Sequence, residues 1–278
     1  MTPALFTIEV LGISVAAGAL GSLLGLGGGI VVVPALTLLL GVDIRYAIGA
    51  SIVSVIATSS GAAATYVRER MANLRVAMFL ELATVTGAVT GALLAGVVAT
   101  RWLYVAFGLL MGWSAVAMLR KRAGQAGSAV PASALADRLA LHGSYYDEAA
   151  GAEVPYRVAG AGKGLGLMYA AGTVSGLLGI GSGALKVPAM DLAMRLPIKV
   201  STATSNFMIG VTAAASAGIY FARGDIDPFI AAPVAAGVLA GATAGSRLLG
   251  RLRSSTIRAV FVAVLVVVST QMLLKGLR

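Results

Sequence analysis

Apolar residues run along this chain in long stretches, and short polar segments separate them. A helix needs about 20 apolar residues to cross a bilayer, and six stretches approach or exceed that length. They are Ile44–Val67, Leu74–Ala99, Leu103–Leu119, Val200–Ala222, Phe229–Leu249 and Ile257–Leu274. Polar or basic residues bound each stretch, as with Arg68 and Arg70 after the first. The pattern predicts an all-α polytopic membrane protein.

Two further apolar regions are broken by glycine. Val10–Leu24 is followed by Gly25–Gly29, where four of five residues are glycine, and then by Ile30–Leu40. Gly164–Leu178 and Ala184–Leu196 flank a similar break. Glycine disfavours a continuous helix, and each arm spans about half to three-quarters of a ~30 Å hydrocarbon core. Each region is either one broken helix that crosses once or a re-entrant hairpin that returns to its own side.

The broken regions are two copies of one motif. Leu23 to Ala35 returns as Leu177 to Ala189 at an offset of 154 positions, and 11 of 29 positions from Leu23 to Ser51 are identical at that offset. The same register holds from Leu11 to Lys121 without an insertion. The chain is therefore a tandem duplication of a four-element unit. We assign 1–120 to the first transmembrane repeat, 121–162 to a linker and 163–278 to the second repeat.

The linker differs in composition from both repeats. It collects Gly, Ser, Ala and charged residues, and it contains His142, the single histidine of the chain. We expect a polar connection with one short helix near Pro131–His142 and a solvated, non-catalytic histidine.

Composition and charge support a membrane location and help to select a topology. Hydrophobic residues make up 58% of the chain and charged residues 12%, whereas a soluble domain is usually about 25% charged. If both broken regions are re-entrant, 15 of the 21 Lys and Arg residues lie on one side and five on the other, with Lys186 inside. Single crossings give a flatter division of 12 and eight. The positive-inside rule favours the steeper split, and hence an inverted repeat with a cytoplasmic linker.

A helix that begins after intramembrane glycines presents unpaired N–H groups and the positive end of its dipole, which together suit an anion. Such backbone must be buried in protein or line a cavity. The interpretation predicts two half-sites meeting near the midplane, and we expect a side chain at Gly181 to obstruct the anion without disturbing the packed core. The alternative is that the glycines only permit close helix packing, as expected of Gly87 and Gly91. The predicted half-site residues are Gly25, Gly27, Gly28, Gly29, Gly179, Gly181, Ser182 and Gly183.

Several polar side chains near the motifs are further candidates. Lys186 replaces Val32 of the first copy, and an ionisable group within a span is usually functional. It binds the anion or couples transport, or else it reaches the surface or neutralises Glu81 or Asp191. Glu81 is the candidate proton carrier, with an interfacial salt bridge as the alternative. The candidate hydroxyl and amide donors are Ser51, Thr204, Ser205 and Asn206.

The paired glycine blocks with Pro34 and Pro188, the Ser201–Asn206 stretch and the four-plus-four plan resemble the TauE/SafE family of sulfite and organosulfonate exporters. The resemblance covers nearly all of the chain outside the linker. It implies a multi-pass inner-membrane secondary transporter that exports sulfite or a C2 sulfonate such as sulfoacetate. Ser182 departs from the all-glycine run of the first copy. An organosulfonate uptake permease and an anion channel remain alternatives.

Other functional classes fit poorly. One histidine, no cysteine and no clustered intramembrane carboxylates argue against an enzyme or a metal site, and we expect no cofactor. The net charge of +10 does not indicate nucleic-acid binding, because the basic residues sit at span ends. The expected partners are a small sulfur-containing anion and the lipid bilayer, with homo-oligomerisation left open.

Overall fold

The computed structural model describes residues 3–24, 28–68, 72–120, 134–147, 151–181, 183–249 and 254–277. The six long apolar stretches all form helices whose ends lie within a few residues of the predicted bounds. These helices are α3 (Ile44–Arg68), α4 (Leu74–Val97), α5 (Thr100–Arg120), α9 (Ile198–Ala222), α10 (Pro228–Leu249) and α11 (Ser254–Leu277). The predominantly helical architecture is therefore confirmed.

Both glycine-rich regions interrupt a helix at the predicted place. In the first copy, α1 (Pro3–Leu24) ends before the glycines and α2 (Gly29–Leu39) begins at the last of them. In the second, α7 (Ala161–Leu178) is followed by α8 (Gly183–Pro188), which continues into a π-helical turn, η1 (Ala189–Ala193). The first arm is longer than the predicted Val10–Leu24, since α1 already begins at Pro3, a residue well suited to a first helical turn.

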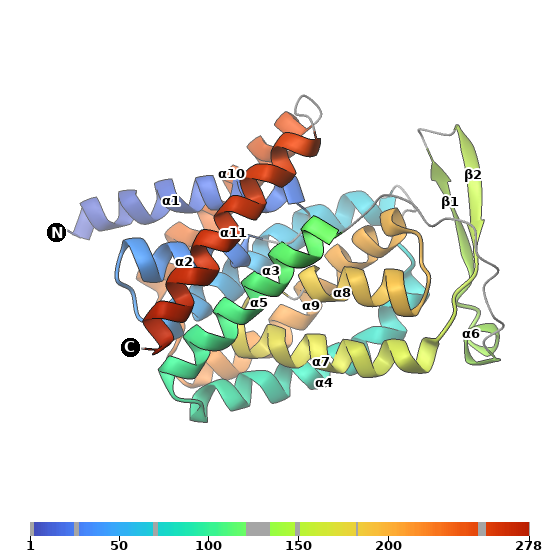
Figure 1. Cartoon of the computed structure of the whole chain (residues 1–278), viewed down its shortest axis with the longest axis horizontal. Helices are drawn as coiled ribbons and strands as arrows, with labels where there is room; N and C mark the ends of the chain where they lie inside the picture. Colours follow the sequence, from blue (N-terminus) through green and yellow to red (C-terminus); the bar gives the residue numbers. More distant parts are fainter. Residues whose placement is uncertain are drawn as a thin grey trace.

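The arms on either side of each break fold back on one another. In Figure 1, α1 runs away from the N-terminus and α2 turns back toward it. In the second copy, the Ala159 N–H, just before α7, donates to the Met194 carbonyl, just after η1, at 3.0 Å. The two ends of that hairpin therefore lie together. Figure 1 also shows both chain termini at one end of the molecule and the linker hairpin at the other.

The second arms end in the same backbone geometry. The Val42 N–H donates to Leu36 O at 3.1 Å, and the Leu196 N–H donates to Met190 O at the same distance. The residue before each donor has a left-handed conformation, with φ of 67° at Gly41 and 56° at Arg195. These positions correspond at the 154-residue offset, so the duplicated sequence produces a duplicated turn.

Each copy packs its first helix against the third span of the other copy. α1 lies on α10 and α4 lies on α7, while α3 meets α9 and α5 meets α11. Glycines permit both exchanged crossings, because a Cβ on Gly87 or Gly172 would strike the backbone of the facing helix, and so would one on Gly241 or Gly18. The packing role predicted for Gly87 and Gly91 is confirmed.

The linker contains the predicted short helix, α6 (Ala134–Arg138), and an element that was not predicted. β1 (Gly143–Asp147) and β2 (Ala152–Tyr156) form an antiparallel hairpin, so the fold is not all-α in its linker. Burial raises the pKa of the Tyr156 phenol, and the phenol oxygen accepts a hydrogen bond from the Asn73 side chain at 2.8 Å. The hairpin is thus joined to the start of α4.

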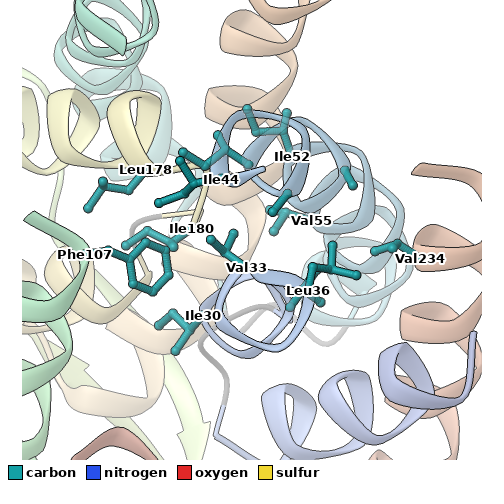
Figure 2. Close-up of a cluster of buried hydrophobic side chains, with 14 of the residues drawn as sticks. Ile30, Val33, Leu36, Ile44, Ile52, Val55, Phe107, Leu178, Ile180 and Val234 are labelled. Carbon is teal, nitrogen blue, oxygen red and sulfur yellow. The ribbon is translucent and has the colours of Figure 1, made fainter. Parts of the chain in front are cut away.

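The interior is aliphatic and the exterior keeps large apolar side chains. Figure 2 shows Ile30 and Val33 of α2, Val55 of α3 and Ile180 of the second glycine block in one buried cluster. Outside, Leu82 is 72% exposed and Phe229 83% exposed, as lipid contact would allow. Within the described residues, two helical segments are long and apolar enough to cross a membrane, Leu74–Val97 and Lys199–Ala222, and shorter apolar segments lie within α1, α2, α3, α10 and α11.

Candidate functional site

The two glycine blocks meet where α3 passes between them. The Ser51 hydroxyl of α3 donates to the Gly179 carbonyl at 2.7 Å. Gly29, at the start of α2, faces the same point, since a Cβ there would lie 2.5 Å from the Ser51 Oγ and 3.1 Å from the Gly179 oxygen. Ser51 and Gly179, predicted as parts of one site, therefore touch, and this contact joins the first copy to the second.

The second glycine block needs glycine for conformation as well as space. Gly179 caps α7 with φ of 66°, and Gly181 has φ of 71°, a region that costs other residues about 1–2 kcal/mol. A Cβ on Gly181 would lie 2.9 Å from both Ile209 and Val55 side-chain atoms. The expectation that Gly181 lies away from the packed core was wrong, because Val55 and Ile209 belong to that core.

The remaining glycine-block residues are only partly described. Gly28 and Gly183 are buried at the starts of α2 and α8, and no side chain caps α2 at Gly28. Predicted residues Gly25, Gly27 and Ser182 lie outside the described part of the chain.

A buried polar chain joins Lys186, Thr212 and Glu81. The Lys186 ammonium donates to the Thr212 Oγ1 at 2.6 Å, and the Thr212 hydroxyl donates to the Glu81 Oε1 at 2.7 Å. Lys186 is fully buried in α8, Thr212 is the fifteenth of 25 residues in α9, and Glu81 lies in α4. We call these three residues the charge relay.

The charge relay explains how a buried lysine is tolerated here. An unpaired buried charge is very costly, whereas a paired and hydrogen-bonded one is stable, and Lys186 and Glu81 are electrostatic partners. The sequence left open whether Lys186 neutralises Glu81 or Asp191. The hydrogen-bonded chain through Thr212 indicates that Lys186 is the counter-ion of Glu81. The Glu81 Oε2 is buried and has no hydrogen-bond partner among the residues that the structure describes, so the carboxylate retains capacity for another donor or for a proton.

The predicted donors of α9 have different surroundings. Thr204 Oγ1 accepts the Asn73 N–H at 3.0 Å and so helps to hold the start of α4. Ser205 is fully buried, and its hydroxyl has no hydrogen-bond partner among the described residues. Asn206 is 9% exposed. Ser205 therefore remains available as a donor, while Thr204 is already engaged in a structural contact.

Thr212 was missed by the sequence interpretation. It is one of many small hydroxyl residues in α9, and its role depends on α9 lying against both α4 and α8. A useful signal was present in retrospect, because Thr212 sits two helical turns beyond Ser205 and thus on the same face of α9.

Comparison with known proteins gives one family and one informative relative. The family model described as Sulfite exporter TauE/SafE matches residues 10–272. A Bacillus subtilis (strain 168) protein described as probable membrane transporter protein YunE is 26% identical over 270 residues, covering 94% of this chain and 95% of that protein. No solved structure matches the chain significantly.

Proposed function

Because the chain belongs to the sulfite exporter TauE/SafE family and is therefore a membrane transporter rather than an enzyme, we propose that it exports a small sulfur-containing anion across the inner membrane. The substrate is sulfite or a C2 organosulfonate such as sulfoacetate. The protein crosses the membrane several times.

The observation that carries this proposal is the burial of Lys186 beside a glycine-broken helix. A fully buried ammonium in an apolar helix bundle favours ligands of negative charge, and the amino end of a broken helix does the same. Lys186 lies one turn into α8, which follows Gly179 and Gly181 directly. The cation and the broken backbone thus belong to one short segment.

We infer that the substrate lies near the membrane midplane between the amino ends of α2 and α8. The surroundings of Gly179 support this, since its carbonyl accepts the Ser51 hydroxyl at 2.7 Å and a Cβ on Gly29 of the first block would lie 3.1 Å from the same oxygen. The unpartnered, buried hydroxyl of Ser205 supplies a further donor on the second copy. Two oxyanion-binding ends that face one another are a recurrent transporter design.

We infer further that both broken regions are re-entrant and that the copies are inverted relative to each other. The hydrogen bond from Ala159 to Met194 supports re-entry of the second hairpin. The exchanged packing of α1 on α10 and α4 on α7 supports a twofold relation between the copies. Both termini then face the periplasm and the linker faces the cytoplasm.

Single-cysteine labelling tests this topology, because the natural chain has no cysteine. A thiol introduced by Ser128→Cys in the linker is expected to react only after the membrane is permeabilised, whereas a cysteine added after Arg278 reacts from outside intact cells. Reaction of both from the same side would overturn the topology.

Transport is tested with purified protein in proteoliposomes. Sulfoacetate inside the vesicles is expected to drive saturable counterflow of labelled sulfoacetate, and sulfite is expected to compete whereas a neutral amide of similar size does not. Flux without saturation or counterflow indicates the channel alternative. Substrate movement in right-side-out membrane vesicles then separates export from uptake. Competition by the neutral amide, or no flux with any sulfur anion, would overturn the proposed substrate class.

A further inference from the structure

The Thr212 hydroxyl carries one hydrogen but lies within hydrogen-bonding distance of two acceptors. It can donate to the Glu81 Oε1 at 2.7 Å or to the Met208 carbonyl of its own helix at 2.9 Å. Its oxygen accepts from the Lys186 ammonium at 2.6 Å. Since one hydrogen cannot serve both acceptors at full strength, the charge state of Glu81 decides where it points.

Protonation of Glu81 rearranges this group without moving a helix. While the carboxylate is ionised, it accepts the Thr212 hydrogen, and Thr212 links it to Lys186. Once protonated, Glu81 becomes a donor to the Thr212 oxygen, and the Thr212 hydrogen turns to the Met208 carbonyl. The hydrogen bonds are preserved, but the negative charge that balanced Lys186 has gone.

No other acidic group among the described residues replaces Glu81 as the partner of Lys186. The charge on Lys186 interacts with Glu81, and Asp191 of the neighbouring η1 is not part of the charge relay. The other charged residues on α4 and on the elements packed against it and against α8 are Arg75, Lys163, Asp191 and Lys199. Asp191 is the one acidic residue among them, and the charge on Lys186 is balanced by Glu81 rather than by Asp191.

We propose that anion binding at Lys186 and proton binding at Glu81 occur together, with Thr212 coupling the two. One proton enters the protein from solution with each anion and leaves with it, so that Lys186 is balanced by Glu81 in the empty protein and by the substrate in the loaded one. This proposal rests on the proposed function, because it needs an anionic substrate at Lys186. It adds that the positive charge of Lys186 is balanced either by the Glu81 carboxylate or by the substrate.

Proton-linked binding is measured by titration calorimetry on the full chain in nanodiscs. Sulfoacetate is a suitable probe because its carboxylate, with a pKa of roughly 4, and its sulfonate both stay ionised between about pH 6 and about pH 8.5. We expect affinity to fall about tenfold per pH unit above the titration of Glu81. Parallel titrations in two buffers of different ionisation enthalpy are expected to show uptake of about one proton per anion.

Glu81→Gln isolates the carboxylate. The amide keeps the shape of the side chain and its donor capacity but cannot ionise, so this variant is expected to bind sulfoacetate at high pH as wild type does at low pH, without proton uptake. A steep pH dependence retained in Glu81→Gln would overturn the assignment to Glu81.

Thr212→Val isolates the coupling hydroxyl, and Thr58→Val is its matched control. Valine keeps the branched shape, so Thr212→Val is expected to bind the anion but to lose much of the pH dependence of its affinity. Thr212→Ser keeps the hydroxyl and is expected to show the pH dependence of wild type. Thr58 donates within its own helix, and its replacement is expected to leave the pH profile unchanged. An unchanged profile in Thr212→Val would remove Thr212 from the mechanism.

The outcomes for the two proposals are separable. If wild type binds sulfoacetate and sulfite at no pH, the proposed anion function fails and the coupling fails with it. If wild type binds equally at low and high pH with no proton uptake, the anion function stands and the coupling alone is wrong.

Discussion

The two copies place the same threonine in opposite environments. Thr212 in α9 and Thr58 in α3 correspond at the 154-residue offset. Thr212 links a lysine to a glutamate, whereas the Thr58 hydroxyl bonds back to carbonyls of its own helix, 3.0 Å from Ser54 O. The positions that correspond to Lys186 and Glu81 hold Val32 and Ala235. Duplication thus produced two equivalent helix arrangements around a threonine. The arrangement around Thr212 carries a lysine and a glutamate, and the one around Thr58 carries a valine and an alanine in their places.

This contrast separates the features that depend on the backbone, which the two copies share, from those that depend on charged side chains. The turns at Gly41 and Arg195 are alike in both copies, so backbone geometry survives divergence of sequence. The charge relay instead requires three particular side chains from three helices. Predictions that convert one copy toward the other therefore separate structure from function.

Lys186→Val is expected to have the largest effect. It gives the second copy the residue of the first, removes the cation from the charge relay and leaves Glu81 without its partner, so we expect loss of detectable anion binding and a destabilisation of about 3–5 kcal/mol. Lys186→Val with Glu81→Ala reproduces the uncharged residues of the corresponding set, Val32 and Ala235, and it is expected to recover most of the stability without recovering binding. Thermal unfolding in detergent and calorimetric titration measure both. A double variant as unstable as the single one would contradict the charge-pairing explanation.

Gly179→Ala is expected to have the next largest effect. The alanine would need φ near 66°, and its Cβ would lie 2.7 Å from a side-chain carbon of Ile48, so strain of about 1–2 kcal/mol adds to overpacking of about 1–3 kcal/mol. Gly41→Ala is the matched control, because Gly41 has φ of 67° and open space around it, and its counterpart Arg195 already carries a side chain. Melting temperatures should fall much further for Gly179→Ala, and equal falls would show that packing at Gly179 is unimportant.

Ser51→Ala is expected to have an intermediate effect. It leaves the Gly179 carbonyl without its side-chain donor, at a cost of about 1–3 kcal/mol. The corresponding residue of the second copy is Ser205, which is equally buried but whose hydroxyl has no partner in the described part of the chain, so Ser205→Ala is expected to leave the melting temperature nearly unchanged. Equal destabilisation by the two substitutions would contradict the difference in bonding between the copies.

Asn73→Ala is expected to have the smallest effect of the four and to exceed its counterpart, Asp227→Ala. Both residues cap a third span, but the Asn73 side chain also donates to the Leu141 carbonyl and the Tyr156 hydroxyl, whereas Asp227 accepts one backbone N–H of α10. Loss of such a cap costs about 0.5–2 kcal/mol, and we place Asn73→Ala near the upper end. Chemical unfolding of both variants measures the difference, and a larger loss for Asp227→Ala would argue against anchoring of the linker through Asn73.

The sequence was most informative where short-range physics decides the structure. The breaks before Gly29 and after Leu178 follow from the helix propensity of glycine, and the span ends follow from the alternation of apolar and charged segments. The hairpin of β1 and β2 was missed because a short run such as Tyr145 and Tyr146 in a polar linker has too little periodicity to predict strands.

The candidate site was predictable in part. Lys186 and Glu81 stood out because ionisable residues are rare in apolar helices, but their connection through Thr212 depends on how α4, α8 and α9 pack. Gly181 was predicted to lie away from the packed core, and its core neighbours Val55 and Ile209 come from helices whose placement no local pattern specifies.

The exchanged packing of α1 on α10 also has a consequence for how the protein is made. Gly237 and Gly241 of α10 lie against Leu11 and Val15 of α1, so α1 is synthesised more than 200 residues before its packing partner. At about 5–20 residues per second, α1 waits on the order of ten seconds or more in the membrane before α10 can cover it. A nascent chain that stops short of Gly237 is therefore expected to depend on other contacts, with lipid or with insertion factors, to cover this face of α1.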